Sequence, residues 1–128
     1  YYRLNTNDAN TTTRIGSGNS FGSATPNNGI YFEKLDADTN WFCVTRNGGV
    51  QTRTDSTIAV DTNFNSFRYV RNSSGVKYFI NNTAVCGTIS TNITTTALSP
   101  GVTILNSAAA SKTFDLDYFE FAMYGLSR

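Results

Sequence analysis

The sequence contains no histidine, and only 15% of its 128 residues are charged. Histidine is the commonest general base and the commonest metal ligand. Its absence removes the side chain that most acid–base and metal sites use. The formal net charge of +1 steers the chain neither to nucleic acid nor to an anionic membrane. We therefore expect no nucleic-acid partner, no cofactor and no metal.

Long apolar runs are also missing, so no segment is predicted to insert into a membrane. No stretch has the pattern of a secretory signal peptide. The sequence starts at Tyr1 rather than at methionine. We interpret this start as a sign of a processed product or of a fragment of a longer protein, in which case the first strands of the fold can be partly missing.

Helix formers never gather into a periodic run, whereas threonine, tyrosine, phenylalanine and valine are frequent. These residues suit pleated, half-buried surfaces, and the 10 glycines and many asparagines supply turns. The composition therefore predicts an all-β chain. Its length is sufficient for one domain with one core, which we assign to residues 1–128.

The stretch from Phe64 to Thr88 has the clearest pattern and predicts three consecutive antiparallel strands. Aromatic and β-branched residues alternate with polar ones through 67–71 and again through 76–80, which is typical of half-buried strands. The two turns are expected at 72–75, where Gly75 tolerates a positive φ, and at the asparagine pair 81–82.

The rest of the chain predicts further short strands separated by turns, nine or ten in all. We expect strands at 1–4, 14–16, 30–35, 41–46, 50–56, 58–60, 101–105 and 113–124, the last being the longest. Polar loops are expected at 5–13, 19–29 and 93–100, and turns at 36–40, 47–49 and 106–112. Turn signals every ~8–12 residues are typical of a β-sandwich or jelly roll.

Cys43 and Cys86 are the only cysteines. A disulfide would join a strand before the three-strand segment to its third strand. The alternative is a pair of free, half-buried thiols, which are common in strands. The sequence cannot place the two Cβ atoms within bonding distance, so both alternatives stay open.

The order of several short motifs resembles that of concanavalin A-like (laminin G-like) jelly-roll domains, in the variant carried by tailed-phage fibres, spikes and head decorations. The motifs are NGIYF at 28–32, NWFCVTRNGG at 40–49, FRYV at 67–70, VKYFINNT at 76–83 and FDLDY at 114–118. Asn81-Asn82-Thr83 stands where that variant has Asp-Gly-Thr or Asn-Gly-Thr. The resemblance covers about 14–124 and implies two curved antiparallel sheets packed face to face. It implies no single activity, because the fold hosts lectins, hydrolases and structural modules.

The fold makes glycan contact a hypothesis, since sugars stack on aromatic rings and present hydroxyls to polar side chains. Trp41 follows a polar turn, and the other candidates lie on the same or neighbouring hairpins: Tyr31, Arg46, Asn47 and Arg53. The alternative for Trp41 is a place in the core or in a contact between subunits, which is where large aromatics most often lie.

Two acidic motifs are weaker candidates. Asp117 and Glu120, in the run from Asp115 to Glu120, resemble the carboxylates of one class of jelly-roll glycoside hydrolases, but only a bulged strand would bring them to one face. The run from Asp36 to Asn40 begins like a calcium loop and then lacks its glycine and its glutamate. A hairpin turn explains the second motif better.

These patterns predict a non-catalytic structural and adhesive domain on the surface of a phage-like virion or another extracellular assembly. Its expected partners are copies of itself, other subunits of the assembly and cell-surface glycans. The alternatives are a free-standing carbohydrate-binding module or lectin, a subunit of a cellular extracellular filament, and a small glycoside hydrolase.

Overall fold

The computed structural model describes residues 2–4, 10–22, 24–107, 109, 111–118 and 120. Within them the chain forms ten strands: β1 (Tyr2–Leu4), β2 (Thr11–Gly18), β3 (Gly29–Lys34), β4 (Asn40–Asn47), β5 (Val50–Ala59), β6 (Phe67–Asn72), β7 (Gly75–Ile80), β8 (Thr83–Ile89), β9 (Ser99–Asn106) and β10 (Phe114–Leu116). The prediction of an all-β chain is confirmed.

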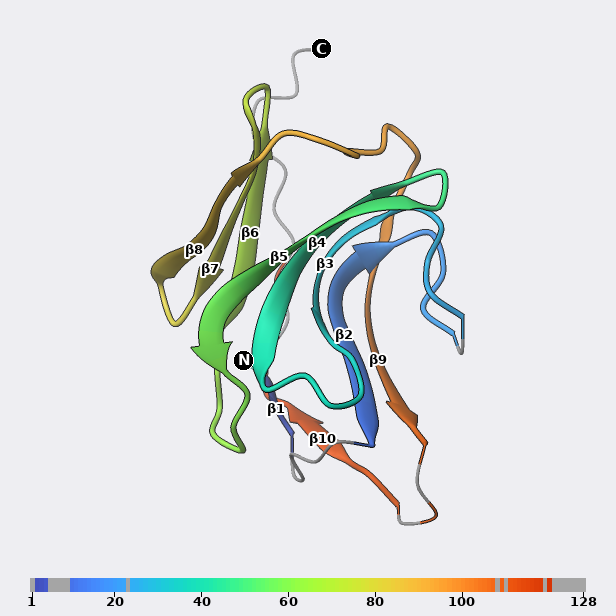
Figure 1. Ribbon diagram of the computed structural model, residues 1–128, viewed down its shortest axis with the longest axis vertical. Helices are drawn as coiled ribbons and strands as arrows, with labels where there is room; N and C mark the ends of the chain where they lie inside the picture. The colour runs from blue at the N-terminus through green and yellow to red at the C-terminus, as the bar shows by residue number, and fades with distance from the viewer. Residues whose placement is uncertain are drawn as a thin grey trace.

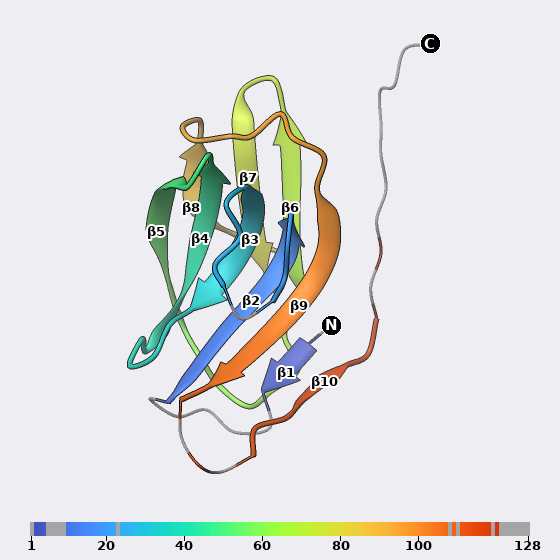
Figure 2. The same ribbon diagram turned by 90° about the vertical axis from the view of Figure 1, so that its right-hand side faces the viewer.

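The strands pair antiparallel in three sheets (Figure 1). The largest has the order β5-β4-β3-β2-β9, the second is the meander β6-β7-β8, and β1 pairs with β10. The three-stranded sheet lies against one face of the five-stranded sheet, as the rotated view in Figure 2 shows. We call this the inner face of the five-stranded sheet and the opposite one its outer face.

The core lies between these two sheets. Phe32 of β3 contacts Phe67 and Tyr78 edge to face, with ring centroids 5.0 and 5.1 Å apart. The Tyr78 hydroxyl donates a hydrogen bond of 2.6 Å to the Val44 carbonyl oxygen, which ties β7 to β4. The remaining buried members of this cluster are Tyr2, Ile15, Ile30, Trp41, Cys43, Val60, Val76, Ile80, Val85 and Ile89.

The predicted three-strand segment and its turns are confirmed. Asn81 and Asn82 adopt φ angles of 50° and 63°, which asparagine tolerates better than most residues, and they join β7 to β8. Gly48 and Gly49, also at positive φ, join β4 to β5. Both hairpin turns therefore lie at the asparagine and glycine residues where the sequence predicted them.

The following boundary predictions are wrong. Thr11–Thr13, expected in a loop, begin β2 because they pair with residues 104–106 of β9. Ser99 and Pro100 begin β9 because they pair with Gly18 and Ser17 at the other end of β2. The pieces predicted at 50–56 and 58–60 form the single strand β5, which continues to Ala59.

Of the longest predicted strand, 113–124, Phe114–Leu116 form β10, whereas residues 113, 117, 118 and 120 are not in a strand. This strand pairs with β1, from Phe114 opposite Leu4 to Leu116 opposite Tyr2. Residues 119 and 121–124 lie outside the described part of the chain.

Candidate functional site

The outer face of the five-stranded sheet brings together three of the residues predicted for glycan contact. Tyr31 in β3, Arg46 in β4 and Arg53 in β5 alternate with core residues, so they point away from the three-stranded sheet. Asn47 ends β4 beside the turn. The strands bow so that the hollow side of their curve is this outer face (Figure 1).

Trp41 lies on the inner face instead. Its side chain is 1% exposed and packs edge to face against Phe67, with ring centroids 4.7 Å apart, and against Tyr2 at 6.3 Å. A ring buried in this way presents no face to a sugar. The structure therefore places Trp41 in the core rather than at a sugar-binding surface.

A chain of ion pairs crosses the outer face. The carboxylate of Glu33 accepts hydrogen bonds from Arg14 Nε at 2.8 Å and from Arg53 Nε at 3.0 Å, and Arg53 also pairs with Asp38. The Arg53 guanidinium lies 3.5 Å from the ring centroid of Phe42. Glu33 and Arg14 are buried, whereas Arg53 and Asp38 are partly exposed. The network therefore holds its two partly exposed members, Arg53 and Asp38, in fixed positions.

The loop at 19–28 covers the other half of this face. Phe21 lies over Gly101, where an added Cβ would come 2.6 Å from its ring, and contacts Tyr31 edge to face at 6.3 Å. Gly16 allows β2 to approach Tyr31, because an added Cβ there would lie 2.6 Å from the Tyr31 Cα. Gly101 thus leaves room for the Phe21 ring, and Gly16 for the backbone of β3.

Tyr31 is fully buried under this loop. Burial, and after it the charge of Glu33, raises the pKa of Tyr31 to about 12, while the positive charges of Arg14 and Arg46 act in the opposite direction. The Tyr31 side chain therefore supports the face from beneath. Its neighbours Arg46 and Arg53 are partly exposed and can contact a ligand, and Arg46 Nη1 donates a hydrogen bond of 2.8 Å to Gln51 Oε1.

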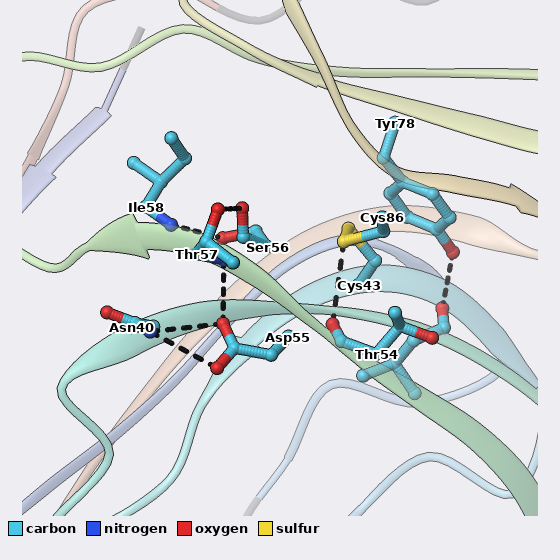
Figure 3. The surroundings of a disulfide bond; sticks show 10 residues. Asn40, Cys43, Thr54, Asp55, Ser56, Thr57, Ile58, Tyr78 and Cys86 are labelled. Carbon is cyan, nitrogen blue, oxygen red and sulfur yellow. Dashed lines mark hydrogen bonds between the residues drawn. A yellow bond between two sulfur atoms is a disulfide. The ribbon is translucent and has the colours of Figure 1, made fainter.

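Cys43 in β4 and Cys86 in β8 are joined by a disulfide that links the two larger sheets (Figure 3). Cys86 lies in a bulge, because the β7–β8 register shifts between Lys77 and Tyr78. Cys86 and Gly87 have φ angles of 62° and 64°. The Thr54 carbonyl oxygen lies 3.4 Å from the Cys86 sulfur. The two cysteines therefore form a disulfide and are not free thiols.

The carboxylates considered for hydrolysis are not gathered on one strand. Asp115 pairs with Arg3, whose Nε and Nη2 lie 2.8 and 2.6 Å from its Oδ2. Asp117 and Glu120 follow the end of β10 and are exposed. The Tyr118 hydroxyl donates to Glu120 at 2.8 Å, and this bond is the main cause that raises the pKa of Tyr118. The bulged strand that the hydrolase hypothesis requires is absent from the described residues.

The run from Asp36 to Asn40 forms the turn between β3 and β4. Asp38 Oδ2 accepts a hydrogen bond of 2.7 Å from the Leu35 amide, and Ala37 has a φ angle of 66°. Asp36 accepts hydrogen bonds from Thr12 and Ser107. The carboxylates of this turn are therefore engaged by protein donors.

Comparisons of the chain with protein-family models, with characterised proteins and with solved structures find no match. Among the described residues, no helix has the length and apolar character that crossing a membrane would require. A function for the chain must therefore be argued from its own residues and contacts.

Proposed function

We propose that this chain is a non-catalytic structural and adhesive domain on the surface of a phage-like virion or a comparable extracellular assembly. Its architecture is, in this proposal, a concanavalin A-like jelly roll whose two larger sheets form a sandwich. The observation that carries the proposal is the outer face of the five-stranded sheet. Its arginines and carboxylates are fixed by one another, which favours holding a polar ligand over transforming it.

The disulfide supports the location outside the cell. Cross-links of this kind persist in oxidising environments and are rare in reducing cytosol. The Cys43–Cys86 bond joins two cysteines that are 43 residues apart in sequence and lie in different sheets. Such a link suits a domain that must survive without repair by chaperones.

Contact with glycans is the second part of the proposal. Arg46 and Gln51 are hydrogen-bonded to each other, and Arg53 lies two residue pairs further along the same hairpin. Side chains whose conformation is already restrained by hydrogen bonds lose little conformational entropy when they bind a sugar hydroxyl in place of water. We propose Arg46, Asn47 and Arg53 as contacts, with Tyr31 beneath them. Neighbouring copies or other subunits of the assembly are proposed to cover the edge strands.

A glycan array tests this proposal, with wild type compared with Arg46→Ala and Asn47→Ala. Arg3→Ala is the matched control, because Arg3 lies on β1, away from the β4–β5 hairpin. We expect the two hairpin variants to lose binding by about tenfold while the control binds normally. Sedimentation velocity on the same samples reports self-association. A wild-type protein that binds no glycan and stays monomeric at all concentrations would refute the proposal.

A further inference from the structure

The charges of this chain are segregated along its sequence. Residues 62–114 contain Arg68, Arg71, Lys77 and Lys112 and no acidic residue, so all nine aspartates and glutamates lie outside that stretch. The strands β6, β7 and β8 fall within it. The three-stranded sheet therefore carries positive charge alone.

Two of these cations stand on the face of the three-stranded sheet that points away from the core. Val76, Tyr78 and Ile80 are buried in the core, so the alternating residues Lys77 and Phe79 point outward. The register places Val70, Lys77 and Thr88 in one row across the sheet, and Arg68, Phe79 and Ala84 in the next. We call these two rows the basic face.

The cations of this sheet are exposed and lack acidic partners. In the part of the chain that the structure describes, Arg68, Arg71 and Lys77 make no ion pair. By contrast, Arg3, Arg14 and Arg53 are each paired with a carboxylate. The Arg68 guanidinium is oriented by Phe79, lying 3.8 Å from the centroid of its ring.

A hollow of about 280 Å³ opens beside Lys77. It lies at the β7–β8 bulge, where the register skips Cys86 and Gly87. Its lining comprises Lys77, Tyr78, Ala84, Val85, Gly87 and Thr88. The disulfide from Cys43 anchors the bulge from beneath.

From this geometry we propose that the basic face binds a linear polysaccharide that bears carboxylate or sulfate groups. Arg68 and Lys77 would contact acidic groups in adjacent rows, ~7 Å apart by the rise of two strand residues. The hollow beside Lys77 would accept the edge of a sugar ring. The inference rests on the proposed adhesive function and names a second surface and a ligand class for it.

Other partners fit the basic face less well. Protein interfaces need a desolvated apolar centre, whereas the exposed large hydrophobic of this face is Val70 alone. Single-stranded nucleic acid needs free aromatic faces for stacking, and Arg68 covers Phe79. A second copy offers few free acids, since Asp36 and Asp55 already accept hydrogen bonds from their own chain.

The experiment titrates the whole chain with four polymers: alginate, which bears carboxylates, dextran sulfate, neutral dextran, and single-stranded DNA. Thr88→Glu places a carboxylate directly opposite Lys77 and removes no cation, so the fold keeps a favourable cross-strand pair. Thr88→Gln is its neutral control. Arg68→Gln combined with Lys77→Gln removes both outward cations, and Arg3→Gln removes a charge elsewhere.

We expect one or both anionic polymers to bind and neutral dextran not to bind. Thr88→Glu and the double variant should each lose affinity at least tenfold, while Thr88→Gln and Arg3→Gln should bind like wild type. Binding should weaken as salt is raised. Binding of alginate alone or of dextran sulfate alone supports the inference and identifies the acidic group.

The inference is overturned if neither anionic polymer binds, if all variants bind equally, or if a nucleic acid binds more tightly than both. Its failure is distinguishable from that of the proposed function. Neutral glycans bound through the Arg46–Asn47 hairpin would leave the adhesive function standing without the basic face. Absence of any glycan binding and of self-association would remove both.

Discussion

Arg14 and Glu33 face each other across β2 and β3, with Nε 2.8 Å from Oε2 and both side chains at most 5% exposed. Glu33 is shared, since Arg53 donates to its other oxygen. A buried carboxylate between two guanidiniums is the electrostatic centre of the outer face. Removing its charge would leave Arg14 buried without a counter-ion.

The first prediction concerns this carboxylate. Glu33→Gln should lower the free energy of unfolding by about 3–5 kcal/mol, because breaking a buried pair strands the remaining charge. Urea unfolding followed by circular dichroism measures the change. Arg3→Gln, which breaks an exposed pair, should cost at most about 1 kcal/mol. Equal losses of unfolding free energy for the two substitutions would show that the buried Arg14–Glu33 pair stabilises the fold no more than the exposed Arg3–Asp115 pair.

The second prediction concerns the disulfide. Replacing Cys43 and Cys86 by serine together should lower the free energy of unfolding by about 2–4 kcal/mol, since the bridge restrains the unfolded chain over a separation of 43 residues. Chemical unfolding of wild type with and without a reductant should show a loss of the same size. If reductant leaves the midpoint unchanged, the bridge is absent or without consequence.

The third prediction uses the single tryptophan as a probe. Trp41 is buried among aromatic rings, so its fluorescence should be blue-shifted in the folded protein and should resist quenching by iodide until the chain unfolds. Trp41→Ala should cost about 3–5 kcal/mol, because it leaves a large cavity in the core. Ready quenching in the native state would contradict the placement of this side chain.

The fourth prediction concerns alkaline pH. Burial raises the pKa of Tyr31 to about 12 and that of Tyr78 well above its ordinary value of 10. Above pH 10 these tyrosines ionise in the unfolded chain but stay protonated in the fold, so stability is complete below pH 10 and is lost as the pH rises toward 12.

Ultraviolet titration of tyrosinate, with circular dichroism on the same samples, measures this effect. We expect the buried tyrosines to ionise together with the loss of the β signal, whereas exposed Tyr118 should ionise reversibly before unfolding. Reversible ionisation of every tyrosine near pH 10 in a folded chain would contradict the burial of Tyr31 and Tyr78.

The local parts of the fold could be predicted from sequence, and the non-local parts could not. Alternation and turn residues located β6, β7 and the turn at Asn81 and Asn82 without knowledge of any partner. The start of β2 depends on pairing with β9, some 90 residues away, and nothing in its threonine-rich sequence indicates that pairing. The pairing of β10 with β1 is likewise non-local, since Arg3 and Asp115 are 112 residues apart.

The candidate surfaces show the same division. Neighbouring hairpins predicted that Tyr31, Arg46 and Arg53 would lie together, but the pairing of Arg14 with Glu33 required the β2–β3 register. Sugar contact was one of the alternatives for Trp41, because the polar turn before it does not indicate which face of the sheet its side chain occupies. The basic face was missed, although the acid-free stretch 62–114 is visible in the sequence.

The central functional claim is that this domain holds polysaccharides without cleaving them. The most direct measurement incubates the chain with a bound polysaccharide and then determines both the reducing ends released and the length of the recovered polymer. We predict intact polymer and no release above a protein-free control. Reducing ends that form in proportion to protein, and that disappear with Asp117→Asn or Glu120→Gln, would contradict the claim.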